Sequence, residues 1–450
     1  MDVLRLFLSA EAAEEAEIFH AFEVRGGEYV SEFTYGSIRG TYAEQPIREG
    51  EPRDYDEKTL YKRYSKLSLY RFLSEKVFKK SLPWGALTGI RPTKLAYREE
   101  ECDYHFEPLL QAMGVSDENV SLVKRVLAAQ QGIYEKRAEN CDLYVSLPFC
   151  PTRCSYCSFI TAPISSTKKY MREYLHSLAR EIEGAKPLVR NLRSVYVGGG
   201  TPFVLEPEEL EEVFKMIAPL RKNGCEYTVE AGRADVFTEE KLELCKRYGV
   251  TRICINAQSF SDCTLERIGR KHTGKQVEEA FAMAKPYGFI VNCDLIAGLT
   301  GESVEEFAFS VDRAMSLAPE NITVHTLCLK KGARLKEETA TLQDEGMQEM
   351  ISLSRKKLTA AGYEPYYLYR QKYMAGAHEN VGWTKKGYAS VYNIDVMEEI
   401  ADNLAVGANA ISKRVILGEG RIERIASPKD IPTYLNKADK LIEEKRKLFQ

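Results

Sequence analysis

The middle of the chain alternates between short apolar runs, rich in β-branched residues, and longer stretches whose apolar residues recur at helical spacing. The apolar runs cover residues 143–149, 194–197, 227–230, 252–257, 289–295 and 322–327. The stretches with helical spacing cover residues 168–183, 207–220, 239–248, 276–287 and 304–317. Strands that alternate with helices predict parallel βαβ units, which right-handed crossovers wind into a barrel-like sheet. We therefore expect an α/β fold whose chemistry lies at the carboxyl ends of the strands.

The first 57 residues follow a different pattern. They predict a strand at 3–8, a helix at 9–22, and two further strands at 29–33 and 37–42 that are separated by turn residues. These elements would form a small α+β module. Ser116 has the position of an N-cap for a later helix, which leads into the barrel.

The end of the chain departs from the βα repeat after about residue 336. A helix is predicted at 347–360, and further helical and turn segments reach residue 450. We interpret this part as a mainly helical region that caps the barrel. The expected domains are an N-terminal α+β region at 1–140, the barrel at 141–335 and the capping region at 336–450.

Residues 58–98 are strongly basic, with eleven Lys or Arg against one acid, Glu75. Interleaved Tyr, Phe and Leu residues predict an amphipathic helix with a solvated basic face. Two interpretations stay open. The stretch is either ordinary solvated surface or a patch for a polyanion, such as RNA or a substrate with several carboxylates.

The composition is that of a soluble globular protein, with 44% hydrophobic and 29% charged residues in 450 positions. We recognise no signal peptide and no apolar run near the about 20 residues that a membrane span requires. Eleven cysteines without the spacing of a disulfide scaffold indicate a reducing compartment. We therefore expect a cytoplasmic monomer, and the net charge of −3 argues against a general nucleic-acid-binding surface.

Three cysteines directly follow the first predicted strand. Cys150, Cys154 and Cys157 have the spacing C-x3-C-x2-C. Three thiolates can hold three irons of a [4Fe-4S] cluster and leave the fourth iron open to a ligand. The alternative is a zinc site, but closed zinc sites use four ligands, and no nearby His or Cys completes the set.

Glycines and polar residues stand at the ends of the next strands. The turn 198–202 reads Gly-Gly-Gly-Thr-Pro, and glycines allow main-chain groups to approach a ligand closely. Glu230, Gln258, Arg270 and Asp294 follow beside later strand ends. Each of them alone is commonly a surface or capping residue, but together they could bind the hydroxyl, carboxylate and ammonium groups of a cofactor. His325 could line the same cavity or be a hydrogen-bonded core histidine.

These motifs resemble the radical S-adenosylmethionine (SAM) superfamily, in which the open iron chelates SAM. Segments 144–150, 198–202, 256–260 and 294–299 resemble the oxygen-independent coproporphyrinogen III oxidase (dehydrogenase) family, and 366–372 with 379–382 resemble its HemZ-type branch. The resemblance covers residues 141–415 well and the first 140 residues at branch level. It implies a partial (β/α)6 TIM-like radical SAM barrel.

The resemblance also assigns expected roles to individual residues. Cys150, Cys154 and Cys157 would bind the cluster. The positions that match SAM contacts are Tyr144, Gly199, Glu230, Gln258, Arg270 and Asp294. The positions that match contacts to a second SAM are Tyr156, Gly200, Thr201, Cys328 and Ile411.

The implied reaction is an oxygen-independent oxidative decarboxylation in heme biosynthesis. A 5'-deoxyadenosyl radical would convert two propionates of coproporphyrinogen III to vinyl groups and give protoporphyrinogen IX. A low-potential donor such as flavodoxin or ferredoxin would supply electrons, and the final electron acceptor cannot be read from the sequence. Basic residues should meet the substrate carboxylates, with Arg370, Lys372 or the basic stretch 58–98 as candidates.

Two positions depart from the family pattern. Phe159 stands where the family has a further cysteine, and heme chaperones of the same superfamily also carry an aromatic residue there. Ser146 replaces a histidine that is common in both groups. A heme-binding chaperone is therefore the second interpretation, although six histidines in the whole chain are few for that role. An RNA-modifying radical SAM enzyme that uses the basic stretch is the third, without a recognisable RNA-binding module.

Overall fold

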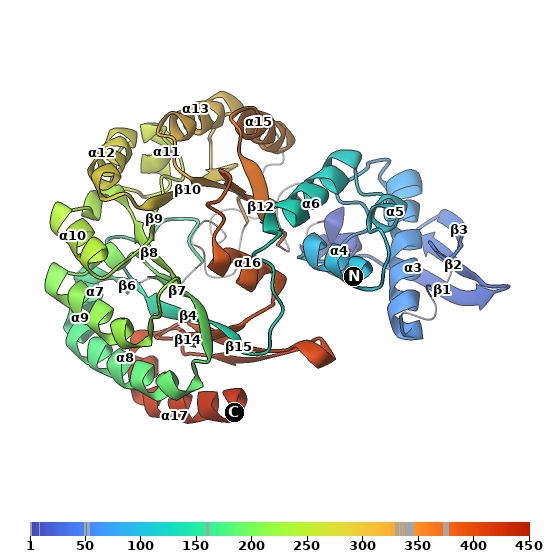
Figure 1. Ribbon diagram of the computed structural model, residues 1–450. Coiled ribbons are helices and arrows are strands. Elements are labelled where there is room, and N and C mark those ends of the chain that lie inside the picture. The colour runs from blue at the N-terminus through green and yellow to red at the C-terminus, as the bar shows by residue number, and fades with distance from the viewer. Residues whose placement is uncertain are drawn as a thin grey trace. The chain divides into compact units, whose positions relative to one another are not determined.

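A computed structural model describes residues 2–8, 10–48, 51, 55–158, 162–328, 333, 335, 346–371 and 378–450. The chain divides into two compact units (Figure 1). The N-terminal unit combines Met1–Ala128 with Leu368–Glu379, and the barrel unit combines Ala129–Tyr367 with Asn380–Gln450. A short segment from late in the chain therefore belongs to the N-terminal unit.

The N-terminal unit contains an antiparallel sheet packed on one helix. Alternate residues of β2 face helix α3: Tyr29 stacks on Tyr64 with ring centroids 4.0 Å apart, and Phe33 stacks on Phe72 at 5.3 Å. Tyr29, Ser31 and Phe33, at every second position, thus form the buried face of the strand. The strands are β1 (Ile18–Arg25), β2 (Glu28–Tyr35) and β3 (Ile38–Glu44), and the helices are α1 (Ala10–Glu15), α3 (Glu57–Phe72), α4 (Pro92–Glu101), α5 (Glu107–Ala112) and α6 (Asp117–Gln130).

Two predictions for the start of the chain were wrong. Leu4–Leu6 form a 3-10 turn instead of a strand, and the helix predicted at 9–22 ends at Glu15. β1 begins at Ile18 and pairs with β2 along its whole length. Cross-strand partners outweighed the helix propensity of this Ala- and Glu-rich segment, because strand formation depends on the neighbouring strand more than on intrinsic preference. The strands predicted at 29–33 and 37–42 are confirmed as β2 and β3.

The basic stretch 58–98 forms most of α3 and, after a loop, most of α4, and the basic face of α3 is not wholly solvated. Arg63 is buried and pairs with Glu51. Arg71 binds Glu44, with Nη1 to Oε1 at 2.9 Å. Lys58 and Lys62 are exposed on the same helix. The expectation of a continuous wet basic face is thus corrected, because part of its charge is neutralised within the unit.

The barrel unit is built on six parallel strands that lie side by side in chain order (Figure 1). Each predicted apolar run forms one strand and each predicted helical stretch forms a helix outside the sheet, which confirms the expected barrel. The strands are β4 (Asn140–Leu147), β7 (Asn191–Gly199), β8 (Glu226–Gly232), β9 (Arg252–Ile255), β10 (Ile290–Ala297) and β11 (Asn321–Thr326). The helices are α8 (Met171–Ala185), α9 (Pro207–Ile217), α10 (Glu239–Arg247), α12 (Gly274–Ala284) and α13 (Val304–Ser316), with the short α7 (Ile164–Thr167) and α11 (Asp262–Arg267) between them.

The C-terminal part of the chain extends this sheet at both edges. β14 lies parallel to β4, with Leu404 opposite Leu143, and β13 lies antiparallel to β11. The sequence predicted helical and turn segments here and missed the strands, because each is too short for a clear period. Its elements are α15 (Met347–Ala360), β12 (Glu364–Tyr369), β13 (Asn380–Thr384), α16 (Val391–Glu398), β14 (Asp402–Val406), β15 (Ile411–Ile416), β16 (Arg421–Ala426) and α17 (Ile431–Phe449).

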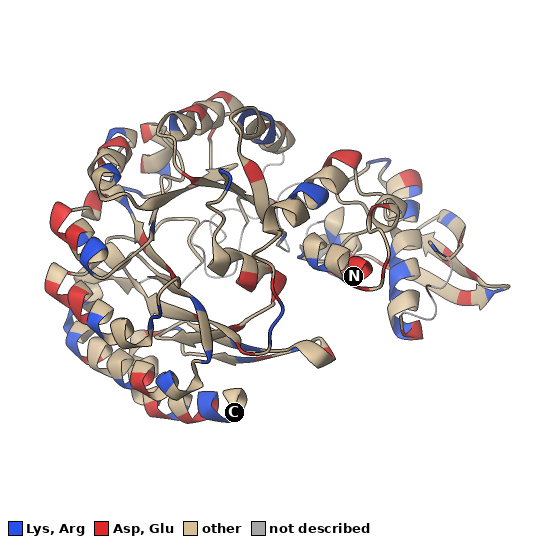
Figure 2. Ribbon diagram, in the orientation of Figure 1, with Lys and Arg blue, Asp and Glu red and all other residues tan. Residues whose placement is uncertain are grey.

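Charges of both signs are interspersed on the helices of the barrel unit, whereas its strands carry few charges (Figure 2). This pattern agrees with strands that are buried on both faces. Among the described residues, no helix combines the length and the apolar character that crossing a membrane requires.

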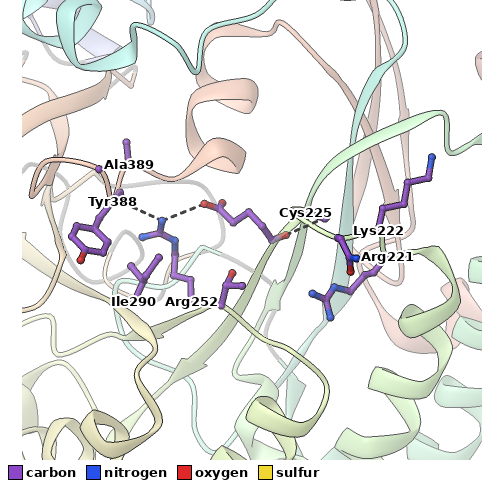
Figure 3. A pocket seen from close by; sticks show the side chains of 12 residues that line it. Arg221, Lys222, Cys225, Arg252, Ile290, Tyr388 and Ala389 are labelled. Atoms are coloured by element: carbon purple, nitrogen blue, oxygen red, sulfur yellow. Dashed lines mark hydrogen bonds and ion pairs between the residues drawn. The ribbon is translucent and has the colours of Figure 1, made fainter.

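A pocket of about 350 Å³ lies at the amino-terminal ends of β8, β9 and β10 (Figure 3). Glu226 lines this pocket, and hydrogen bonds fix its side chain. The carboxylate accepts hydrogen bonds from Arg252 Nη2 at 3.2 Å and from Ser390 Oγ at 2.8 Å. The backbone N–H groups of Val391 and Tyr392 also bond to this carboxylate, at 3.1 and 3.2 Å. These contacts attach α16 to the barrel, so we assign this end of the barrel a structural role.

Candidate functional site

The three motif cysteines lie at the carboxyl end of β4. Cys150 ends the short strand β5 (Phe149–Cys150), which pairs with β6 (Ala162–Pro163), and Cys154 and Cys157 follow in the next loop. Cys150 and Cys154 are buried. Burial raises the pKa of the Cys150 thiol to about 12, and charge on the neighbouring Cys157 and Cys154 raises it further. A positive metal centre would compensate the charge of the Cys150 thiolate.

The donor set fits a cubane cluster better than a single ion. Within the described ranges, no group of three or more His, Cys, Asp or Glu side chains is arranged to hold one metal ion. In a [4Fe-4S] cluster each thiolate binds a different iron, so the sulfurs stand farther apart than the ligands of one ion. Three thiols in one loop, close enough to influence one another's charge, meet this requirement. Phe159, the aromatic residue that follows them, lies outside the described residues.

The loop that carries these cysteines rests on the segment after α11. Ser155 N donates to Ile268 O at 3.0 Å, and Thr152 Oγ1 donates to Gly269 O at 3.4 Å. Tyr156 packs against an apolar cluster that includes Leu265 and Ile268. The segment after α11 thus holds the loop by hydrogen bonds to its main-chain carbonyls and by one apolar contact.

The glycine turn lies directly against this loop. Gly200 N donates to Leu147 O at 2.8 Å, and Thr201 N donates to Phe149 O at 2.7 Å. A Cβ on Gly200 would overlap the Phe149 carbonyl oxygen. Gly199 has φ +107°, and a Cβ there would lie 2.7 Å from Ser146 Oγ. Only glycine permits this approach, so the turn places its main chain beside Cys150, whose Sγ lies 3.4 Å from Thr201 Oγ1.

Two carboxylates, one on β8 and one on β10, come from the strands on either side of β9 and lie close enough to influence each other's charge. Tyr196 OH donates to Glu230 Oε1 at 2.7 Å, and Gly199 N–H also bonds to this carboxylate. Burial raises the pKa of Glu230 to about 7, and the nearby Asp294 adds to this effect. Burial opposes ionisation of Asp294 too, but hydrogen bonds that include one from His325 hold its pKa below the ordinary value. Near neutral pH, Asp294 is therefore ionised while Glu230 is partly protonated.

Gln258 presents an unsatisfied polar atom to the site. Its Oε1 is buried and accepts no hydrogen bond from the described residues. Its backbone has φ +68°, which is uncommon for a residue with a side chain. Its N–H donates to Asp294 O at 2.8 Å, which fixes it beside β10. A strained residue with an unpaired buried oxygen is characteristic of a ligand-binding position.

Arg270 joins the cysteine loop to the strand ends. Its Nη1 donates to Asn256 O at 2.5 Å and its Nη2 donates to Tyr156 OH at 3.1 Å. A further hydrogen bond links it to Cys154. The guanidinium therefore brings a fixed positive charge to the cysteine loop.

The remaining predicted residues lie on the strands or follow them. Tyr144 stacks near Tyr196 and Tyr392, with ring centroids 6.1 and 6.3 Å apart. Cys328 directly follows β11. Ile411 begins β15, which runs antiparallel to β14 and so starts at the edge where β4 and β14 end.

Several contact residues escaped the sequence analysis. Tyr196, which holds Glu230, lies two positions before Gly198 in β7 and therefore shares its face. Asn292 donates to Asp294 Oδ1 at 2.7 Å from the same face of β10. Each lies two residues before a position of a predicted motif, Gly198 or Asp294, on the same face of its strand.

Arg370 does not have the environment of an open propionate anchor. It is buried in the N-terminal unit, where its Nη1 donates to Leu87 O and its guanidinium lies 5.4 Å from the Trp84 ring centroid. Burial lowers its pKa to about 10. The guanidinium is thus used in packing, which corrects the expectation for this residue. Lys372 lies outside the described residues.

Comparison with known proteins identifies the family. Residues 144–314 match the radical SAM superfamily. The sequence is 34% identical to the oxygen-independent coproporphyrinogen-III oxidase-like protein HemZ of Bacillus subtilis, over 92% of this chain and 87% of the relative. The chain belongs to this radical SAM family. Radical SAM proteins use a [4Fe-4S] cluster and SAM, and these are the cofactors of this chain.

Other radical SAM relatives match a smaller part of the chain. The heme chaperone HemW of Bacillus subtilis is 31% identical over 54% of this chain and 67% of the relative. Coproporphyrinogen III oxidase (HemN) from Escherichia coli superposes with a TM-score of 0.56 at 21% identity, over 73% of this chain and 74% of that chain. The superposition shows that the radical SAM fold is shared.

Proposed function

We propose that this protein catalyses the oxygen-independent oxidative decarboxylation of coproporphyrinogen III to protoporphyrinogen IX. The observation that carries the proposal is the similarity to HemZ over 92% of the chain, which extends well beyond the barrel. The similarity to HemW, in contrast, covers 54% of the chain for the Bacillus subtilis protein and 68% for the Haemophilus influenzae protein. The site geometry supports the proposal because it offers binding groups for both cofactors.

We assign the cluster to Cys150, Cys154 and Cys157, with Arg270 bonded to Cys154 beside them. When bound, the cluster and SAM supply a 5'-deoxyadenosyl radical that can remove a hydrogen atom from the β carbon of a propionate. The substrate then loses carbon dioxide and one electron as the vinyl group forms, so each decarboxylation needs a one-electron acceptor. A low-potential donor such as flavodoxin or ferredoxin would reduce the cluster.

The polar residues at the strand ends would hold SAM. Glu230 and the main chain at Gly199 form an acidic, carbonyl-rich corner that suits the SAM ammonium group. The ionised Asp294 suits ribose hydroxyls, and the unpaired Gln258 Oε1 can accept one further hydrogen bond. Arg270 suits the methionyl carboxylate. Tyr144 would cover this site from β4.

A second group of residues would contact a second SAM or the substrate. These are Tyr156, Gly200 and Thr201 beside the cysteine loop, and Cys328 and Ile411 at the rim. Ile411 is 46% exposed, so its side chain is available to an apolar ligand. The porphyrinogen ring is a large apolar surface of this kind.

The decisive experiment incubates the anaerobically reduced, reconstituted protein with SAM and coproporphyrinogen III. We expect protoporphyrinogen IX to form without oxygen when a cell extract supplies an electron acceptor. Cys154→Ala should abolish iron binding and turnover. Cys245→Ala is the matched control, because this thiol is fully buried on α10 away from the loop and should leave both unchanged.

The second candidate function is heme binding by a chaperone, which the similarity to HemW favours. The same preparation should be titrated with heme and, separately, with RNA. Stoichiometric heme binding without porphyrinogen turnover would favour the chaperone and refute the proposed reaction. RNA-dependent SAM cleavage would refute it in favour of RNA modification.

A further inference from the structure

A buried arginine lies behind the cysteine loop and takes no part in the assignments above. Arg233 directly follows β8 and is 2% exposed. Its Nε donates to Asp235 Oδ1 at 2.9 Å and its Nη2 donates to Asp235 Oδ2 at 2.6 Å. This two-point pairing fixes the plane of the guanidinium. His272, also 2% exposed, backs the carboxylate with Nδ1 3.7 Å from Asp235 Oδ1.

The third nitrogen of this guanidinium, Nη1, contacts the cysteine loop. Arg233 Nη1 donates to Thr152 Oγ1. Thr152 lies between Cys150 and Cys154, and its hydroxyl in turn donates to Gly269 O at 3.4 Å. The single hydroxyl therefore ties the loop to two supports from different parts of the barrel, the end of β8 and the segment after α11.

We propose that Arg233, locked by Asp235, is a positioning residue that sets the spacing of the cluster thiolates through Thr152. Partners behind metal ligands orient those ligands and reduce their freedom before the metal binds. Pro151 and Thr152 are half-buried and Arg153 is exposed, so these hydrogen bonds add to the few contacts that hold this part of the loop.

This proposal concerns the cluster and does not depend on the substrate. Its test therefore measures iron retention. Thr152→Val keeps the shape of the side chain but removes the hydroxyl that accepts from Arg233 and donates to Gly269. Thr152→Ser keeps the hydroxyl. Thr228→Val is the matched control, because Thr228 is buried on β8 and its Oγ1 has no hydrogen-bond partner among the described residues.

The three variants and the wild type are reconstituted anaerobically, and the release of iron to a chelator is followed by absorbance. We expect Thr152→Val to lose iron faster or bind it more weakly by about 10- to 100-fold, as for other partners of metal ligands. Thr152→Ser and Thr228→Val should match the wild type. Arg233→Met should reproduce the effect of Thr152→Val and should not add to it when the two are combined.

A second measurement separates positioning from general stability. The thermal unfolding of the iron-free proteins should be the same for Thr152→Val and Thr228→Val. Iron release at the wild-type rate in Thr152→Val would overturn the proposal. Equal iron loss in Thr152→Val and Thr228→Val, or a loss matched by lower stability of iron-free Thr152→Val alone, would also overturn it.

Discussion

Lys445→Met should destabilise the barrel unit strongly, because it leaves a buried carboxylate without its cation. Glu181 on α8 is 0% exposed and Lys445 on α17 is 1% exposed, and the two form an ion pair. The other carboxylate oxygen, Glu181 Oε2, accepts from Tyr434 OH at 2.6 Å and from Gly407 N at 2.8 Å. These two neutral donors will remain in the variant.

The magnitude follows from this environment. Breaking a buried ion pair by removing one partner costs about 3–5 kcal/mol, because the other charge stays buried without compensation. The two remaining hydrogen bonds to Glu181 retain part of its stabilisation, so we expect a value near the lower end, about 3 kcal/mol. The double variant Glu181→Gln with Lys445→Met removes both charges and should recover much of the loss. The coupling free energy between the two substitutions then measures the interaction energy of the Glu181–Lys445 pair.

The same two helices supply a matched control. Arg180 Nη1 lies 2.7 Å from Asp439 Oδ1, but these side chains are 42% and 75% exposed. Arg180→Met should therefore cost no more than about 1 kcal/mol. All variants are made in a Trp84→Phe background, so that Trp383, which is buried in β13, is the only tryptophan reporter of urea unfolding. A loss below about 1 kcal/mol for Lys445→Met, or equal losses for Lys445→Met and Arg180→Met, would refute the reasoning.

Three further predictions concern the site and the barrel interior. Gly200→Ala should displace the loop at Phe149 and reduce iron content, whereas Gly418→Ala, where a Cβ meets no atom within 4 Å, should not. Because the pKa of Glu230 is about 7, the affinity for SAM should fall as the pH drops from 8 to 6. Glu230→Gln should bind SAM weakly at both pH values. Equal wild-type affinity at pH 8 and pH 6 would contradict this prediction. Burial raises the pKa of Asp142, and it raises the pKa of Asp395 to about 7. The native state therefore binds protons more tightly than the unfolded chain, and the free energy of unfolding falls as the pH rises toward 7. Asp142→Asn should therefore raise the unfolding midpoint at pH 8, and a lower midpoint would disprove the assignment.

The loop from 407 to 410 connects the buried Glu181–Lys445 ion pair to the candidate cofactor site. Gly407 N bonds to Glu181, and Ser146 Oγ donates to Ala408 O at 2.7 Å. Ser146 O accepts from Tyr174 OH at 2.7 Å. Ser146 thus links β4 to α8 and to the end of β14, which is a role that its place in the motif did not suggest.

Local sequence was enough to predict the barrel and the main binding motifs. Parallel strands buried on both faces appear as continuous apolar runs, and the amphipathic helices between them have their own period. The cysteine spacing and the turn 198–202 are also local features, because their residues are close in the chain. For this reason the six strands, their helices and the cysteine loop were expected at nearly their observed positions.

Contacts between distant residues could not be predicted in this way. Glu181 and Lys445 are separated by 264 positions, and Thr152 and Arg233 by 81. Neither pair leaves a periodic signal, since each depends on which elements the topology brings together. The added strand β14 also leaves no clear pattern in the sequence, because its five residues are stabilised by pairing with β4 and not by their own strand propensity. The sequence thus specifies the elements and the residues that we propose as cofactor ligands, whereas tertiary packing determines which side chains hold those residues in place.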